Sequence, residues 1–477
     1  MTSWVKRSLK KAPVGGIGVP DWHIGGTDPS AAGAQGSSEA AGAACCAAKA
    51  TLDGAASAKP ATSPAVIIQR RPNMVPPCFL MGSSPHHHNA AGARQVPAVV
   101  ASTERGSGVA LTPTVRGEQM ANTAPATIMR GEIAASIEVV QGLIADRARL
   151  EAIGVQLAER RPKVIVVAGR GTSDHAAIYG RYLLEHAVGV PVALAAASLV
   201  TQYGIETASP ESVLIAFSQS GAGPDMIALV ESARRRGALT IALTNEAASP
   251  LATAADATVY LAAGEERAVA ATKTYIAELV CVALIAAAAA RALGRDAAWA
   301  NDLQQLPERM RGALAAADAW IAAARGSSQF AGMLAADRAL VVGRGFEFPN
   351  ALEFALKLRE TTGAFGDGYS AADLLHGPIA SAGAGVPAIL LATDTATMES
   401  MEIARQRLAV AGSPTLTLRT SGGASDAASI RLPDGPAGPL SAPATAIAGL
   451  ALIEAIATGR GRNPDAPAGL TKVTKTL

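Results

Sequence analysis

The chain has 477 residues, of which 49% are hydrophobic but only 4% aromatic. This length allows two or three domains, and the alanine-rich composition favours helices packed closely on sheets over a sandwich with an aromatic core. Residues 1–119 hold eleven basic and six acidic side chains, so the remaining 30 basic and 33 acidic residues make the segment 120–477 mildly acidic. This balance, with no basic stripe in the sequence, argues against a nucleic-acid partner.

Cysteine usage and hydropathy bear on the compartment. The four cysteines are Cys45, Cys46, Cys78 and Cys281, and they form neither a CxxC pair nor a disulfide framework. A reducing compartment fits this pattern, so we expect a cytoplasmic protein. The longest uncharged apolar run, 279–290, has twelve residues, whereas a membrane-spanning helix needs about 20. It predicts a buried helix and no membrane partner.

Residues 1–119 show no sustained periodicity and are rich in Ala, Gly, Ser and Pro. Such a stretch cannot bury enough apolar surface to offset its ordering entropy, which predicts a disordered low-complexity segment. The three consecutive histidines at 86–88 are interpreted as part of it rather than as a metal site. A targeting peptide is a second interpretation, although no clean apolar region precedes a cleavage site. Translation from Met120 is the interpretation we favour.

Regular patterning starts in the segment 120–149, where apolar residues recur at helical spacing and predict a helical lead-in. The apolar run at 164–168 is predicted to be a buried strand, followed by a Gly-Arg-Gly turn and a helix at about 174–188. Strands that alternate with helices indicate a parallel sheet covered on both faces. Further strands are predicted at 191–195, 213–217, 238–243 and 257–261.

The second half of the chain echoes the first. Leu340-Val-Val-Gly-Arg-Gly345 leads into a predicted helix at about 349–362, just as Val166-Val-Ala-Gly-Arg-Gly171 leads into 174–188. The shared order of strand, turn and helix indicates a duplicated α/β domain. Later elements are predicted as strands at 387–392 and 414–418 and a helix at about 440–458.

A turn rich in serine and glycine, Ser218-Gln-Ser-Gly-Ala-Gly223, follows the predicted strand 213–217, and Pro224 then opens a helix. Open α/β sheets bind ligands beyond the carboxyl ends of their strands. A helix N-terminus offers free N–H groups and a positive dipole end, to which the two serines add donors. The pattern therefore predicts an anion cradle, although a plain strand-to-helix turn uses the same residues. It is neither a Walker P-loop nor a full GxGxxG.

Together these motifs resemble the SIS (sugar isomerase) domain family. Ser218-Gln-Ser-Gly221 is similar to its phosphate loop, Gly171-Thr-Ser173 to its first-strand loop and Val269-Ala-Ala-Thr-Lys273 to its Val-Ala-Ser-Thr-Lys segment. Gly343-Arg-Gly…Ala351-Leu-Glu-Phe-Ala-Leu-Lys-Leu-Arg-Glu360 and Leu375-His-Gly-Pro378 resemble the isomerase half of glucosamine-6-phosphate synthase. The resemblance runs from about residue 128 to the C-terminus, and the motifs occur in order.

The resemblance implies an α/β fold of two tandem SIS domains, each a parallel sheet flanked by helices, after the disordered segment. In chain order we expect a disordered segment at 1–119, a helical lead-in at 120–149, a first SIS domain at 150–295, a helical linker at 296–325, a second SIS domain at 326–460 and a C-terminal active-site tail at 461–477.

The resemblance also implies three catalytic residues. Aldose–ketose conversion needs a carboxylate that moves a proton between C1 and C2 and a group that opens the ring. Glu360 is implied as the proton-shuttling base and His376 as the ring-opening acid/base, donated by the neighbouring subunit of a homodimer. Lys472, in a segment similar to the family's closing Pro-x-x-Leu-x-Lys, is implied as a Schiff-base amine. From spacing alone, Glu360 is equally a solvated charge and His376 a structural histidine.

The implied substrate is an amino-sugar phosphate, with no cofactor and no metal required. Glu353, Lys357 and Glu360 are spaced to share one helix face. The implied substrate-binding residues are Gly171, Thr172, Ser173, Ser218, Gln219, Ser220, Gly223, Val269, Ala270 and Lys357.

One departure from the synthase pattern helps to choose between activities. That pattern has Glu-Thr where this chain has Ala222 and Gly223, and the Ala-Gly-Pro-Asp run looks more like the SIS-type glucosamine-6-phosphate deaminases. No glutaminase domain is recognisable in 1–119. We therefore expect a deaminase that converts glucosamine 6-phosphate into fructose 6-phosphate and ammonia. The alternatives are a galactosamine- or tagatose-type deaminase/isomerase, a synthase-like isomerase without a glutaminase domain, and a non-catalytic phosphosugar sensor.

Overall fold

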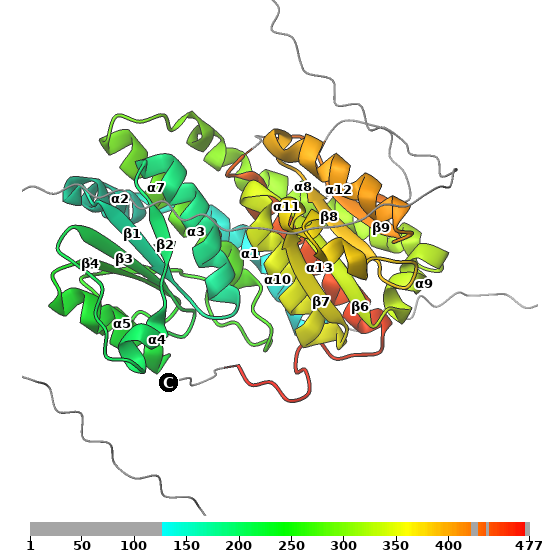
Figure 1. The fold of residues 1–477 in the computed structure, drawn as a ribbon, viewed down its shortest axis with the longest axis horizontal. Coiled ribbons are helices and arrows are strands. Elements are labelled where there is room, and N and C mark those ends of the chain that lie inside the picture. Colours follow the sequence, from blue (N-terminus) through cyan, green and yellow to red (C-terminus); the bar gives the residue numbers. More distant parts are fainter. Residues whose placement is uncertain (1–125, 421–427, 436–437, 473–477) are drawn as a thin grey trace, which may run out of the picture. The chain divides into compact units, whose positions relative to one another are not determined.

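The computed structural model describes residues 126–420, 428–435 and 438–472, all of which belong to one compact unit (Figure 1). The predicted disordered segment 1–119, with its three consecutive histidines at 86–88 and three of the four cysteines, lies outside the described residues. Two helices open the described chain, α1 (Ile128–Ala145) and α2 (Arg147–Arg160). The Thr127 side chain caps α1 by accepting the Arg130 N–H, which fixes where the helix begins.

The first sheet is fully parallel, with strand order β2-β1-β3-β4-β5. Its strands lie within about two residues of the predicted positions. They are β1 (Val164–Ala168), β2 (Val192–Leu194), β3 (Ser212–Phe217), β4 (Leu239–Thr244) and β5 (Ala257–Tyr260). The helices of this half are α3 (Thr172–Val188), α4 (Ala197–Thr201), α5 (Pro224–Arg235), α6 (Pro250–Ala254) and α7 (Lys273–Ala292).

A helical stretch connects the two sheets: the 3-10 helix η1 (Ala298–Gln305), α8 (Leu306–Ala324) and α9 (Ser328–Ala335). The second sheet is also parallel, with order β7-β6-β8-β9-β10. Its strands are β6 (Arg338–Gly343), β7 (Phe365–Ser370), β8 (Ala388–Ala392), β9 (Thr415–Arg419) and β10 (Ser429–Arg431).

The helices of the second half include α10 (Phe348–Lys357), which continues into the π-helix η3 (Leu358–Thr362). The others are η2 (Gly345–Glu347), α11 (Ala371–Leu375), η4 (Pro378–Ser381), η5 (Thr395–Thr397), α12 (Met398–Val410) and α13 (Ser441–Gly459). The sequence predicted one continuous helix at 349–362 and missed its widened last turn. It also missed β7 and β10.

The two sheets share one topology, in which the first strand of each half lies between the second and the third. Their first turns also match. A Cβ at Gly169 would lie 2.4 Å from the Ser173 carbonyl oxygen, and a Cβ at Gly343 would lie 2.3 Å from that of Glu347. Gly171 and Gly345 have φ values of 56° and 59°. Both turns therefore require glycine at the same places, which agrees with the predicted duplication.

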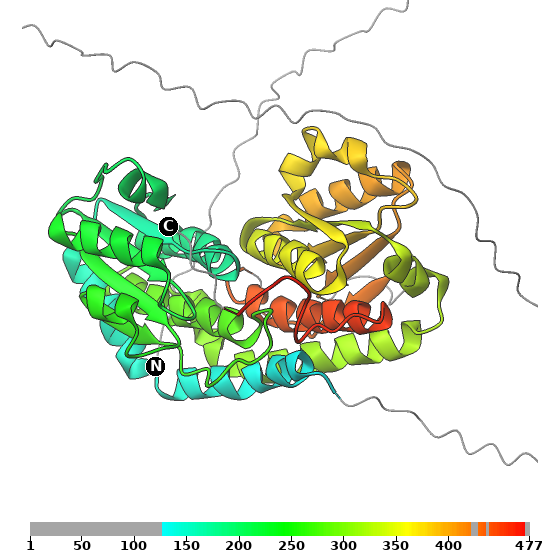
Figure 2. The same cartoon turned by 90° about the horizontal axis from the view of Figure 1, so that it is seen from below.

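One hydrophobic core joins the inner faces of both sheets. It contains α1, α7, α8 and α13, and Figure 2 shows α1, α8 and α13 alongside one another. Alternate strand residues separate the faces: Ile215 of β3 lies in this core, whereas Leu214 packs against α5 in a smaller cluster. By length and composition α7 and α13 could each cross a membrane, but most of both helices is buried inside the protein.

The second half differs from the first where its turn meets the core. Glu347, at the position that matches Ser173, is fully buried. Its carboxylate accepts hydrogen bonds from Thr393 (2.6 Å), Ser441 (2.7 Å) and Thr445 (3.0 Å). Burial raises the pKa of Glu347, which these donors only partly offset.

Candidate active site

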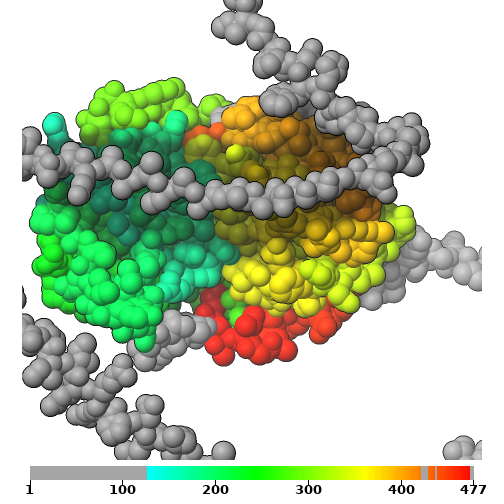
Figure 3. All heavy atoms as spheres, in the orientation of Figure 1, coloured from blue at the N-terminus to red at the C-terminus, as the bar shows by residue number. Residues whose placement is uncertain are grey.

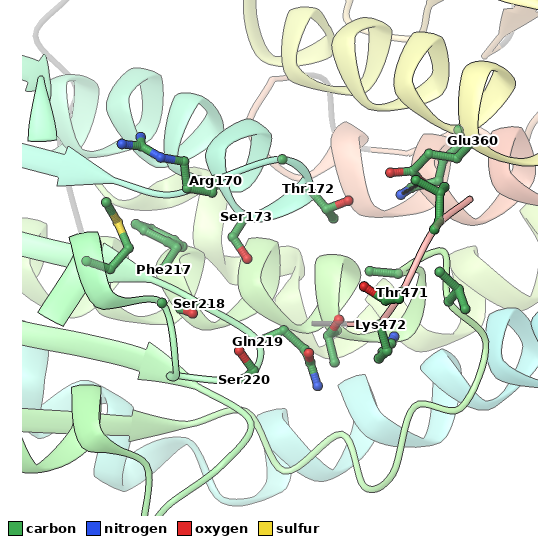
Figure 4. A pocket seen from close by; sticks show the side chains of 18 of the residues that line it. Arg170, Thr172, Ser173, Phe217, Ser218, Gln219, Ser220, Glu360, Thr471 and Lys472 are labelled. Atoms are coloured by element: carbon green, nitrogen blue, oxygen red, sulfur yellow. Dashed lines mark hydrogen bonds and ion pairs between the residues drawn. The ribbon is translucent and has the colours of Figure 1, made fainter. Parts of the chain in front are cut away.

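A cavity of about 430 Å³ opens at the carboxyl ends of β1 and β3 (Figure 4). Parallel sheets bind ligands at this edge because the turns after the strands carry free N–H groups and hydroxyls. All predicted site residues except Ala270 and His376 line the cavity: Gly171, Thr172, Ser173, Ser218, Gln219, Ser220, Gly223, Val269, Lys357, Glu360 and Lys472.

The serine turn, residues 218–223, forms one wall. Gly221 has φ of 57°, and a Cβ there would lie 2.1 Å from Ser249 Oγ, so the turn accepts only glycine. The Gly221 N–H donates to Ser218 Oγ at 3.2 Å. The turn ends at the N-terminus of α5, where N–H groups are free of intrahelical partners. Together with the hydroxyls of Ser218 and Ser220, this end suits a bound anion.

An arginine that the sequence reasoning missed flanks the serine turn. Arg170, in the Gly-Arg-Gly turn after β1, lies with Nε 2.8 Å from Asp225 Oδ2. Asp225 is buried in the first turn of α5, whereas the Arg170 side chain is 50% exposed. The pair joins the turns that follow β1 and β3, and it places the Arg170 guanidinium beside the wall that suits an anion. The sequence signal that could have identified Arg170 is a charged residue between the two glycines of this turn.

A chain of ion pairs forms the opposite wall. Glu353 and Lys357 of α10 are fully buried, with 3.4 Å between Oε1 and Nζ, and Lys357 Nζ also contacts Glu360 of η3. The shared face that their spacing predicted is therefore observed. Glu353 also accepts a hydrogen bond from Thr172 Oγ1 (3.1 Å) and lies 2.7 Å from His175 Nδ1. A buried acid of the second half is thus tied to the first turn of α3.

These contacts set the charges of the buried groups. Burial alone would raise the pKa of Glu353, but the charge of Lys357 and the hydrogen bond with His175 lower it overall. Burial also disfavours the charge on Lys357, yet Glu353 and Glu360 raise its pKa above the ordinary value. Lys357 is therefore a cation held between two carboxyl groups. Of the two carboxyl groups paired with Lys357, that of Glu360 lines the cavity, and its side chain is 23% exposed.

The C-terminal residues Leu470, Thr471 and Lys472 close another side of the cavity. Figure 3 shows that residues from this end of the chain (red) lie on the molecular surface. Lys472 Nζ lies 2.8 Å from both Glu266 Oε2 and the Ala268 carbonyl. Burial would raise the pKa of Glu266, but the charge of Lys472 and backbone N–H donors lower it. Lys472 is held here as one half of an ion pair, with a carboxylate in contact that can accept its proton.

Two predicted residues lie elsewhere. His376 is exposed at the end of α11 and is not among the cavity residues. Its donation to a neighbouring subunit stays a prediction. Ala270 is buried beside Val269 and contributes no surface to the cavity. The lining residues that the sequence reasoning missed are Arg170, Phe217, Asp225, Met226, Ala271, Thr274, Leu470 and Thr471.

Within 126–420, 428–435 and 438–472, no group of three or more His, Cys, Asp or Glu side chains is arranged to hold an ion. The cavity offers hydroxyls, backbone N–H groups, two carboxyl groups and three cations. These groups can bind a sugar phosphate, move a proton and hold an amine near a carbonyl carbon.

Comparison with known proteins gives the family. A family model described as SIS domain matches residues 160–288, the part of the chain that contains the serine turn. The isomerizing glutamine–fructose-6-phosphate aminotransferase of Pyrococcus horikoshii is 33% identical over 313 residues, which cover 65% of this chain and 51% of that protein. The corresponding protein of Symbiobacterium thermophilum is 34% identical over 272 residues, 56% of this chain and 43% of its own length. The chain thus spans about half the length of the curated relatives it matches.

Solved structures agree with this result. A candidate phosphosugar isomerase from Silicibacter pomeroyi DSS-3 is 30% identical, with a TM-score of 0.61, and the match covers 71% of this chain and all of that one. The C-terminal domain of glucosamine-fructose-6-phosphate aminotransferase from Francisella tularensis shares the fold at 22% identity and TM-score 0.64, with 73% of this chain and 99% of that chain covered. Glucosamine-6-phosphate deaminase from Thermotoga maritima shares it at 20% identity and TM-score 0.54, with 71% and 100% covered.

Proposed function

The chain belongs to the SIS domain family, and from this premise we propose that it is a deaminase/isomerase that converts glucosamine 6-phosphate into fructose 6-phosphate and ammonia. The observation that carries the proposal is one cavity with the serine turn on one wall and Glu360 on the other. A phosphate held at the turn leaves the sugar carbons free to lie toward Glu360. The curated relatives are named for fructose 6-phosphate, and a glucosamine-6-phosphate deaminase shares the fold.

In the proposed reaction, the phosphate is bound by Ser218, Ser220 and the N-terminus of α5. After the ring opens, the Glu360 carboxylate removes the proton from C2 and returns it to C1, through an enolamine. The product is an imine at C2, whose overall hydrolysis releases ammonia and leaves the ketone. Lys357 stabilises the Glu360 carboxylate before the first proton transfer and after the second, since its cation is in contact.

Lys472 is proposed as an amine nucleophile at C2. It must first lose its proton, and Glu266 is the carboxylate in contact with it. The neutral amine can then displace ammonia from the C2 imine, and water regenerates the lysine as it releases fructose 6-phosphate. His376 is proposed to open the ring in the site of a partner subunit, which makes a homodimer the working unit. We place the protein in the cytoplasm on the cysteine pattern.

We further propose that both halves are SIS domains, at 150–295 and 326–460, with 461–477 as the active-site tail. The shared strand order and the matched glycine turns support this division. The first domain supplies the phosphate turn and the second supplies Glu360 and Lys357.

Ammonia release by the full chain tests the proposal. With glucosamine 6-phosphate as substrate, we expect steady release, and Glu360→Gln should reduce kcat by about 10²–10⁴-fold because it removes the proton carrier. Glu138→Gln, on the exposed side of α1, is the matched control and should release ammonia as the wild type does. Galactosamine 6-phosphate, run in parallel, distinguishes the epimer.

The other outcomes separate the alternatives. Faster turnover of galactosamine 6-phosphate would support the galactosamine-type enzyme. Glucosamine 6-phosphate formation from fructose 6-phosphate and ammonia, without the reverse reaction, would support a synthase-like isomerase. Binding of both amino sugars without ammonia release would indicate a phosphosugar sensor and would contradict the proposal.

A further inference from the structure

A buried carboxyl group lies directly behind the proposed phosphate site. Glu278, in the second turn of α7, is 1% exposed. Its Oε1 lies 2.8 Å from Ser173 Oγ. Ser173 lines the cavity at the start of α3, and Figure 4 shows its side chain between Thr172 and the serine turn. Glu278 itself does not line the cavity, so it can act on a ligand only through Ser173.

The groups around Glu278 give it no counter-charge. Glu266 faces it from the loop before α7, Glu353 from α10, and Tyr275 and Cys281 from α7 itself. Glu266 is paired with Lys472, and Glu353 with Lys357. Within the described residues, no lysine, arginine or histidine lies at ion-pair distance from Glu278.

Burial without a counter-charge therefore favours the neutral form of Glu278. Burial raises its pKa to about 8, with Glu266 and Glu353 adding to the effect and the Ser173 hydrogen bond opposing it. A neutral carboxyl group has a proton to donate, whereas a carboxylate only accepts. A serine hydroxyl has one hydrogen to donate and two lone pairs. An ionised Glu278 therefore requires the Ser173 hydrogen to point toward it, and only a neutral Glu278 can donate to Ser173 Oγ instead.

We propose that neutral Glu278 is a positioning residue that donates to Ser173 Oγ and so leaves the Ser173 hydrogen free for the bound phosphate. The inference rests on the proposed function, because it assumes a phosphosugar at this site. When Glu278 ionises, Ser173 must donate to the carboxylate instead. The phosphate then loses one donor and gains a negative charge behind Ser173. Phosphosugar affinity should fall as the pH rises through the pKa of Glu278.

Calorimetric titration of the full chain with fructose 6-phosphate tests this inference. Fructose 6-phosphate has no amine, and its phosphate stays dianionic well above a second pKa of about 6, so the ligand does not titrate in the alkaline range. The wild-type Kd should rise about tenfold between about pH 7 and about pH 9.5, the effect of losing one hydrogen bond to a charged group. In Glu278→Gln the amide donates to Ser173 at every pH, so its Kd should not change over that range.

Ser173→Ala provides a second test that is independent of how well Glu278→Gln folds. It removes the donor itself, so it should bind about tenfold more weakly than the wild type near neutral pH and approach it at high pH. Equal Kd curves for the wild type and either variant would overturn the inference while leaving the proposed function in place. Absence of fructose 6-phosphate binding at every pH would overturn both.

Discussion

At the scale of single residues, Gly223 is a position in the serine turn that lines the cavity without a side chain. Its backbone has φ −70° and ψ 117°, which any residue adopts, and the nearest atom to a Cβ placed there is Asp225 Oδ1 at 3.4 Å. Unlike Gly221, this position therefore accepts a side chain. The synthase pattern has threonine here, so under the proposed function we expect a hydroxyl at this place to contact the phosphate.

We predict that Gly223→Thr strengthens substrate binding. The new hydroxyl adds one hydrogen bond to a charged group, so KM for the phosphosugar should fall by about three- to tenfold. Threonine and glycine are comparable at a helix N-cap, so α5 should stay intact. Steady-state kinetics measure the effect, and Gly223→Ala, which adds Cβ without the hydroxyl, is the control. Equal KM values in the two variants would contradict the prediction.

The sequence predicted the cavity residues that belong to local motifs, such as Ser218 and Ser220, because a strand end followed by a helix start defines their setting. It did not predict Asp225 or Glu278. Their roles depend on burial and on partners more than 50 positions away, Arg170 and Ser173. Glu278 did leave a trace, as an acidic residue in an otherwise apolar helix.

At the scale of elements, the buried ion pair of α10 carries a large desolvation cost. Glu353 and Lys357 are both removed from water, and each is tolerable only while the other is charged. The π-helix that follows widens the last turn and brings Glu360 back to Lys357. Such single π turns are frequently found at functional sites.

We predict that Lys357→Met lowers the free energy of unfolding by about 3–5 kcal/mol, because it leaves Glu353 buried without a counter-charge. Denaturant unfolding measures this loss. Arg147→Met breaks an exposed pair of the same spacing, 3.2 Å from Glu151, and should cost less than about 1 kcal/mol.

The pH dependence of the same variants gives a further check. Since the folded pKa of Glu353 is lowered, its contribution is present above the ordinary carboxyl pKa and is lost as the pH falls through the folded value. The difference between wild type and Lys357→Met should shrink on acidification. A difference that is constant with pH would contradict the ion-pair explanation.

The predicted elements agree with the structure where the hydrophobic runs are strong. The missed strands are those whose position depends on packing against a neighbouring element. β7 reads Phe365-Gly-Asp-Gly-Tyr-Ser370, a composition that does not favour a strand. Its two glycines are needed because a Cβ at Gly366 or Gly368 would lie 2.4 or 2.8 Å from a carbonyl oxygen of α10. Only the neighbouring helix explains this strand. β10 has three residues, too few for a pattern.

At the scale of the whole molecule, the exposed position of His376 raises the question of whether the proposed site is built from one chain or completed by two. The histidine follows α11 and lies outside the cavity of its own chain. If a partner completes the site, each cavity contains Glu360 from one subunit and His376 from the other.

We predict that co-expressed Glu360→Gln and His376→Asn chains recover activity that neither variant has alone. Random pairing makes half of the dimers mixed, and each mixed dimer has one intact site, so about a quarter of wild-type activity should return. Ammonia release from the purified mixture measures it. A chain that carries both substitutions, mixed with His376→Asn, is the control and should recover nothing. No recovery in the test mixture would place both residues within one chain.

The buried Glu347 is a clear difference between the two halves. Where the first half keeps a serine and an open cavity, the second half has its own carboxylate, satisfied by three hydroxyls. The three hydroxyls thus bind a carboxyl group of the protein itself. Under the proposed function, the second half supplies Glu360 and Lys357 to a substrate whose phosphate is held by the first half.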